Sequence, residues 1–216
     1  MTPRTFERPA VIALPGEEGE QGLALEGLFV PSGEEESWGA VIAPPHPLYG
    51  GSMDSPVVTE IAYACAKSEI ASLRFNWRGV GGSAGEMTGE GPAAIADYAA
   101  CLKFLEETVP GPVVACGYSF GAATAVAAAY RVPRVQQLLL VAPPAAMLDA
   151  EVLQAFPGRV FIAVGDNDEF APAARVEAIA GGCENAHLEV IPDTDHFFMT
   201  SLGALGKSAG EWLAGD

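Results

Sequence analysis

One stretch of the sequence, residues 112–130, reads PVVACGYSFGAATAVAAAY. It begins with a short apolar run of the kind that forms a buried strand, and it ends with an alanine-rich run typical of a helix. Between them lies Gly117-Tyr118-Ser119-Phe120-Gly121, a G-x-S-x-G motif. Between a strand and a helix, this motif places a serine on a sharp turn with its hydroxyl exposed above a sheet. The stretch therefore predicts an α/β fold with Ser119 as a candidate nucleophile.

The glycines of the motif suit this interpretation. Gly117 and Gly121 leave room where neighbouring backbone crowds a tight turn. The helix behind Ser119 directs its positive end towards any negative charge that develops beside the serine. The alternative is an ordinary glycine-rich turn in which Ser119 only caps the helix. The strand–turn–helix context favours the nucleophile.

The rest of the chain alternates between strand and helix patterns. The predicted strands outside residues 112–130 are Ala10–Leu14, Leu23–Val30, Gly39–Ala43, Ile70–Asn76, Gln137–Ala142, Val160–Val164 and His187–Ile191. The predicted helices are Ser55–Lys67, Glu90–Thr108, Leu148–Phe156, Ala171–Ala180 and Thr200–Leu213. Short buried strands separated by helices indicate a mostly parallel central sheet with helices on both faces. We find no linker, and expect one domain spanning residues 1–216.

A serine hydroxyl needs a general base, and the chain has three histidines. His196 follows the last predicted strand and a short turn, so it lies on a loop at the carboxyl edge of the sheet. His187 lies within that strand and is expected to be a surface or structural residue. His46 follows an early strand and is expected to be a loop histidine bonded to the backbone. His196 is therefore the predicted base.

The base in turn needs a carboxylate that orients it. The strand Val160–Val164 runs into Gly165-Asp166-Asn167-Asp168, and an acid on this loop reaches a histidine on the next strand-end loop. We favour Asp168; the alternative is Asp166, which would otherwise cap or brace the loop. The spacing leaves both open. The chain order serine, aspartate, histidine is the one expected for this architecture.

Five segments carry a resemblance to a known family. They are Pro45-His46-Pro47-Leu48-Tyr49-Gly50-Gly51-Ser52-Met53, Leu73-Arg74-Phe75-Asn76-Trp77-Arg78-Gly79-Val80-Gly81, the serine motif, Val141-Ala142-Pro143-Pro144 and Asp195-His196-Phe197-Phe198. On these residues the sequence resembles the α/β-hydrolase superfamily. Within it, the sequence is similar to small, lid-less bacterial serine hydrolases and carboxylesterases with dienelactone-hydrolase-like features. Dienelactone hydrolases proper use a cysteine nucleophile, whereas this chain has Ser119.

The resemblance implies that the loop after the early strand supplies half of an oxyanion hole. Pro47 has no N–H, so the donor lies beside it, and Leu48 is the best candidate. The backbone N–H of Phe120 is the expected second donor. Only 17 residues separate Ala142 from Val160, too few for a substantial cap. We therefore expect an open site whose pocket is lined by Tyr49, Met147, Phe170 and Phe197.

Composition narrows the function further. The chain of 216 residues carries a net charge of −17, which disfavours nucleic acid, anionic lipid and strongly anionic substrates. The four cysteines show no metal-binding spacing, and neither a secretory signal nor a membrane span is evident. We expect a cytoplasmic monomer or homodimer without metal or cofactor.

A further glycine pattern, Gly79-x-Gly81-x-x-Ala84, formally matches a dinucleotide fingerprint. The predicted helix does not follow it at once, so we interpret this segment as a structural loop braced by Asn76 and Arg78. The sequence thus predicts a serine hydrolase acting on small to medium carboxylic esters. The alternatives are a thioesterase, lactonase, amidase or peptidase with the same residues, or a non-catalytic binding protein.

Overall fold

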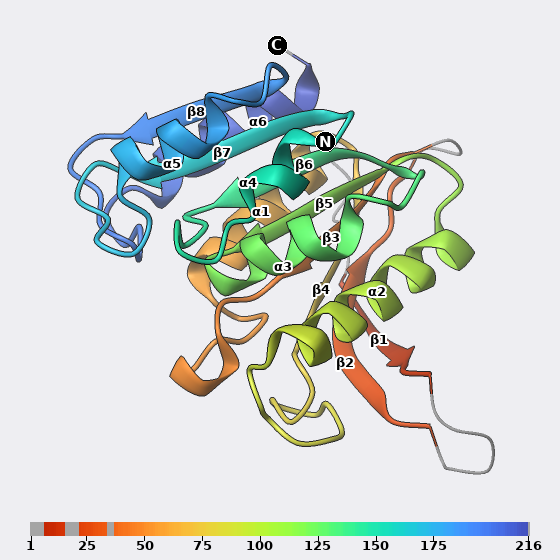
Figure 1. The fold of residues 1–216 in the computed structure, drawn as a ribbon. Coiled ribbons are helices and arrows are strands. Elements are labelled where there is room, and N and C mark those ends of the chain that lie inside the picture. The colour runs from red at the N-terminus through yellow and green to blue at the C-terminus, as the bar shows by residue number, and fades with distance from the viewer. Residues whose placement is uncertain (1–6, 16–21, 34–36, 216) are drawn as a thin grey trace.

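An eight-stranded sheet forms the centre of the computed structural model, which describes residues 7–15, 22–33 and 37–215 (Figure 1). The strands follow the order β1-β2-β4-β3-β5-β6-β7-β8. Their bounds are β1 Arg8–Ala13, β2 Ala24–Val30, β3 Gly39–Ala43, β4 Ala71–Phe75, β5 Val113–Tyr118, β6 Val135–Val141, β7 Arg159–Gly165 and β8 Ala186–Ile191. β2 is antiparallel to both of its neighbours. The other six strands, β4, β3, β5, β6, β7 and β8 in sheet order, pair in parallel. The predicted mostly parallel sheet is confirmed.

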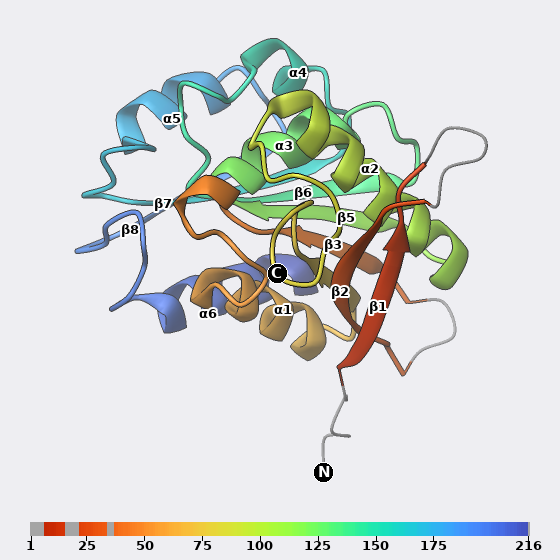
Figure 2. The same cartoon turned by 90° about the horizontal axis from the view of Figure 1, so that it is seen from below.

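Helices cover both faces of this sheet (Figure 2). The helices are α1 Pro56–Lys67, α2 Gly91–Thr108, α3 Phe120–Ala129, α4 Ala150–Gln154, α5 Ala173–Ala180 and α6 Leu202–Ala214, with a short 3₁₀ turn η1 at Pro47–Tyr49. α1 and α6 pack together on one face, whereas α2, α3, α4 and α5 lie on the other. Because the sheet is enclosed, every residue of β3, β4 and β5 is buried.

The strand order reverses beside β3, and this reversal places the functional loops. The chain leaves β3 towards β4 on one side, and later returns to add β5 on the other. Loops that leave the carboxyl ends of such strands diverge and open a crevice between them. The loop after β3 and the serine motif after β5 therefore meet at one point of the sheet edge.

The connection between β6 and β7 decides how open this edge is. It contains only the five-residue helix α4 and two short loops, so no cap domain covers the strand ends. Within the described part of the chain, no helix is both long and apolar enough to cross a membrane.

Candidate active site

The serine motif forms a strained turn between β5 and α3. Ser119 has φ 55° and ψ −122°, a conformation that non-glycine residues rarely adopt. A Cβ at Gly117 would lie 2.3 Å from the Gly121 backbone, and a Cβ at Gly121 would lie 2.5 Å from the Pro44 oxygen. Both glycines are therefore required for the backbones to approach so closely, as the sequence predicted.

His196 and Asp168 meet the serine at this turn. Nε2 of His196 lies 2.9 Å from Oγ of Ser119, and Nδ1 lies 2.8 Å from Oδ2 of Asp168. The histidine and the aspartate are both buried. The three predicted residues thus form one hydrogen-bonded chain, although they come from loops after three different strands.

The second oxygen of Asp168 is also bonded, because Oδ1 accepts the backbone N–H groups of Phe170 and Ala171 at 2.8 and 2.7 Å. These bonds fix the carboxylate so that its other oxygen faces the imidazole. Since a buried carboxylate needs such partners, the turn at residues 168–171 is the local reason that Asp168 remains in place.

Asp166, the alternative acid, has a different position. Its Oδ1 accepts the backbone N–H of Thr194 at 3.0 Å and the side-chain amide of Asn167 at 2.8 Å. Backbone hydrogen bonds, first from Thr194 and then from Asp193, lower the pKa of Asp166 below its ordinary value. Asp166 therefore braces the loop after β8, and Asp168 is the acid beside His196.

The backbone of His196 is anchored by a residue that sequence reasoning missed. The hydroxyl of Tyr118 donates to the carbonyl oxygen of His196 at 2.9 Å, and the two rings lie 5.6 Å apart. Burial, followed by the charges of Asp168 and Asp195, raises the pKa of Tyr118, so its hydroxyl stays a donor. Because Tyr118 and His196 are 78 residues apart in the chain, no local pattern reveals this contact.

The other two histidines lie where the sequence predicted. His187 is exposed on β8, stacked on Phe161 at 5.7 Å. His46 precedes η1, and its Nδ1 accepts the backbone N–H of Leu48 at 3.2 Å. The predicted oxyanion donor Leu48 therefore has an acceptor within its own loop in this structure. The second predicted donor, the N–H of Phe120, belongs to the first turn of α3, where amides lack intrahelical acceptors.

The side chain of Trp77 binds the loop that follows β3, which we call the β3 loop. Nε1 of Trp77 donates to the carbonyl oxygens of Pro44 and Pro45, at 3.2 and 3.0 Å. The ring of Trp77 also packs edge-on against Phe120 at 5.6 Å. Since Trp77 is buried, these bonds fix the position of the β3 loop relative to α3.

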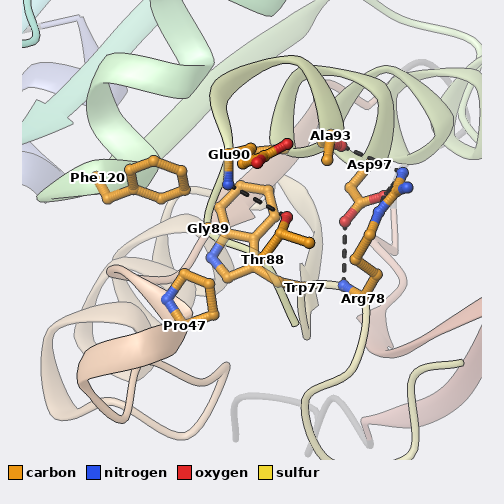
Figure 3. Close-up of a pocket in the computed structure, with 10 residues that line it drawn as sticks. Pro47, Trp77, Arg78, Thr88, Gly89, Glu90, Ala93, Asp97 and Phe120 are labelled. Atoms are coloured by element: carbon orange, nitrogen blue, oxygen red, sulfur yellow. Dashed lines mark hydrogen bonds and ion pairs between the residues drawn. The ribbon is translucent and has the colours of Figure 1, made fainter. Parts of the chain in front are cut away.

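A small cavity separates these loops (Figure 3). Pro47, Gly89 and Phe120 line one part of it, and the ion pair of Arg78 with Asp97 lines another. Arg78 binds Asp97 through its backbone N–H and its guanidinium. The glycine-rich segment is thus a braced loop, and α2 begins only at Gly91, as the sequence predicted.

Exposed apolar side chains lie on the loops that follow the carboxyl ends of four strands. We call this set the apolar rim; its members, from the loops after β3, β6, β7 and β8, are Leu48, Tyr49, Met147, Phe170, Phe197 and Met199. The four predicted pocket residues are among them, but none of the four lines the cavity of Figure 3, so their role in a substrate pocket stays a prediction. The ring of Phe170 lies 4.9 Å from that of His196, and the ring of Phe197 lies 5.8 Å from it.

No group of three or more His, Cys, Asp or Glu side chains is placed to hold a metal ion among the described residues. The four cysteines are buried as free thiols. At the carboxyl edge of the sheet, a hydroxyl, an imidazole and a carboxylate lie in series, an arrangement suited to proton transfer.

Comparison with known proteins agrees with this fold. A family model for the alpha/beta hydrolase fold matches residues 47–159. The chain belongs to the alpha/beta hydrolase fold family. An uncharacterized protein of Rickettsia prowazekii is 30% identical over 200 residues, which cover 88% of this chain and 84% of that protein.

Solved structures of alpha/beta hydrolases are similar along nearly the whole chain. An alpha-beta serine hydrolase homologue from Coxiella burnetii has a TM-score of 0.84 and 32% identity, over 96% of this chain and 97% of that one. A serine hydrolase without a lid from Xanthomonas campestris has a TM-score of 0.79 and 29% identity, over 94% and 93% of the two chains. The fold and these relatives support hydrolase activity.

Proposed function

We propose that this protein is a serine esterase that cleaves small to medium carboxylic esters through an acyl-enzyme. The observation that supports this most is the chain of hydrogen bonds from Ser119 through His196 to Asp168, at 2.9 and 2.8 Å. These are the distances at which a base takes a proton from a nucleophile while a carboxylate orients it.

In the first half-reaction, Nε2 of His196 takes the proton of Ser119 as the serine oxygen attacks the acyl carbon. Asp168 keeps the imidazole in the tautomer that leaves Nε2 free, and stabilises the imidazolium that forms. The backbone N–H of Phe120, together with that of Leu48, stabilises the oxyanion. His196 then returns its proton to the departing alcohol.

In the second half-reaction, His196 activates a water molecule, which attacks the acyl-enzyme. The tetrahedral oxygen occupies the same oxyanion hole, and its collapse releases the acid and restores Ser119. The reaction consumes one ester and one water and forms one acid and one alcohol. Each step uses only groups of this chain.

The apolar rim supports the choice of substrate. Exposed apolar side chains around a nucleophile offer contact to the acyl or alcohol part of an ester, and the site has no cap that would enclose a long chain. A net charge of −17 disfavours anionic substrates such as coenzyme A thioesters. We therefore expect uncharged esters to be the best substrates.

The test is hydrolysis of p-nitrophenyl esters from acetate to decanoate by the wild type and by Ser119→Ala. We expect turnover of the short esters by the wild type and a loss of about 10⁶-fold in kcat in the variant. A fluorophosphonate probe should label Ser119 in the wild type alone.

The combined outcomes separate the alternatives. Absence of both turnover and labelling in the wild type would refute the serine hydrolase and leave a binding protein. Labelling without ester turnover would refute the esterase but keep the nucleophile, and thioesters, lactones and amides would then be compared as substrates.

A further inference from the structure

The Leu48 amide has a partner that the proposed mechanism does not use. Nδ1 of His46 accepts this N–H at 3.2 Å. The backbone of His46 is extended, with φ −61° and ψ 125°, and its side chain caps the 3₁₀ turn that begins at Pro47. Since proline has no N–H, the Leu48 amide is the first one that the cap can reach.

The imidazole of His46 also packs against the side chain of Phe120, whose backbone N–H is the second predicted oxyanion donor. Its ring centroid lies 4.6 Å from that of Phe120 and 4.9 Å from that of Tyr49. Gly89, in the loop before α2, packs directly against the ring, because a Cβ at Gly89 would lie 2.4 Å from Cε1 of His46. The backbone of Gly89 also has a φ of +66°, which favours glycine. His46 is thus held between the two segments that carry Leu48 and Phe120.

The contact defines the protonation state of His46. Nδ1 accepts a hydrogen bond only when it carries no proton, so the ring is neutral in this arrangement. Burial lowers the pKa of His46 below its ordinary value, which keeps the ring neutral at neutral pH. The titratable group against the ring is the Tyr49 phenol, and Glu90 follows Gly89 in the loop on its other side.

We propose that His46 is a positioning residue of the reaction: its neutral ring holds the Leu48 amide in the resting enzyme and yields it to the oxyanion in the transition state. The inference rests on the proposed function. A bond of 3.2 Å to a neutral ring nitrogen lies at the long end of the normal range. A charged oxygen is a stronger acceptor, so the amide gains from the exchange as negative charge develops.

This role gives His46 a place in the pH profile. When the His46 ring is protonated, Nδ1 carries a proton and can no longer accept a hydrogen bond from the Leu48 N–H. The Leu48 amide then loses the acceptor that positions it. Full activity then requires both His196 and His46 to be neutral. On the acid side, log(kcat/KM) for the wild type should exceed a slope of 1 over the pH range in which His46 takes its proton, because kcat/KM reports groups of the free enzyme.

The experiment uses two substitutions at one position. His46→Ala removes the acceptor, and we expect kcat on a short p-nitrophenyl ester to fall about 10-fold with little change in KM, less than the loss of a whole oxyanion donor. His46→Asn keeps an acceptor that bonds the N–H two residues on, as in an Asx turn. This variant should recover most of the rate, and its acid limb should have a slope of 1. His187→Asn is the matched control and should keep the wild-type slope and rate.

A second measurement does not depend on turnover. In ¹⁵N-labelled wild type, the Leu48 amide resonance should move in step with the His46 ring during acid titration, and in His46→Asn it should not. Thermal unfolding of each variant identifies a loss of fold.

Three results would overturn the proposal: a folded His46→Ala with the wild-type rate, a slope unchanged by His46→Asn, or a Leu48 amide insensitive to the His46 titration. Each of them leaves a wild type that still cleaves esters. Failure of the proposed function would instead show as a wild type with neither turnover nor labelling.

Discussion

The two sides of Ser119 are built in different ways. On the acid–base side, the loops after β7 and β8 bring Asp168 and His196 into one chain of side-chain hydrogen bonds. On the proposed oxyanion side, the loop after β3 carries the backbone N–H of Leu48, and the side chains of His46 and Trp77 bond to the backbone of that loop. In the proposed mechanism, the reactive groups are side chains on the first side and main-chain groups on the second.

This difference governs what a substitution can reveal. Exchanging Asp168 or His196 removes the group that acts, so the effect on rate is direct. Exchanging Leu48 leaves its N–H in place, so the oxyanion side responds only when a residue that holds the loop is changed. Trp77 and His46 are two such residues, because each bonds the backbone of the loop after β3.

The largest loss of kcat is expected from Asp168→Asn, on the acid–base side. An amide in place of the carboxylate fixes the imidazole in the wrong tautomer, and kcat should fall about 10⁴-fold. Asp166→Asn is the matched control, because its side-chain oxygen can still accept the Thr194 N–H, and it should change kcat by about twofold or less. Steady-state kinetics on p-nitrophenyl acetate decides; equal effects of the two variants would contradict the assignment of the acid.

An intermediate effect is expected from Trp77→Phe on the oxyanion side. Phenylalanine keeps ring packing against Phe120 but removes the donor to the Pro44 and Pro45 carbonyls. We expect the free energy of unfolding to fall by about 1–3 kcal/mol and kcat to fall about 10-fold.

Trp212→Phe on α6 tests whether this effect is local. Trp212 packs on Phe161 at 5.5 Å, so its replacement lowers stability at a distance from the β3 loop and should leave kcat unchanged. A Trp77→Phe variant with lowered stability and an unchanged kcat would show that the loop keeps its geometry without the indole.

The smallest effect is expected at the apolar rim. Tyr49 is 88% exposed, so Tyr49→Ala costs the fold little. Loss of about 40 Å² of apolar contact to a bound ester, at about 25 cal/mol per Å², corresponds to about a fivefold rise in KM. The rise should appear for p-nitrophenyl hexanoate and be smaller for acetate. Val11→Ala, an exposed apolar residue on β1, is the control, and a KM that Tyr49→Ala leaves unchanged would remove the phenol ring from the substrate contact.

Much of the fold follows from the sequence because its elements have strong local signals. The short apolar runs at β3, β5 and β7 predict buried strands, since charged residues are absent from their centres. Most predicted boundaries differ from the structure by one or two residues. The turn η1 was missed because two prolines and two glycines around it satisfy many loop conformations equally well.

The acid–base side was predictable for a related reason. Three histidines and a fixed chain order leave few choices, and Asp168 lies directly after a strand. The sequence leaves open the contacts between residues that are distant in the chain. The choice of Asp166 or Asp168 as the acid depends on which of the two carboxylates binds the Thr194 backbone. The hydrogen bond from Tyr118 to His196 also joins residues far apart in the chain. The role of His46 depends on Gly89, which is equally remote.

The position of β8 at the end of the sheet has a consequence for how the proposed activity responds to denaturant. Among the described residues, β8 pairs with β7 alone and is only partly buried, whereas β5 lies between two strands and is fully buried. Peripheral strands open with less free energy than the centre of a domain. His196, the proposed base, therefore follows a strand that opens with less free energy than β5, the strand that precedes Ser119, the proposed nucleophile. Inactivation by mild denaturant should accordingly precede global unfolding and reverse on dilution, with amide exchange in β8 faster than in β5.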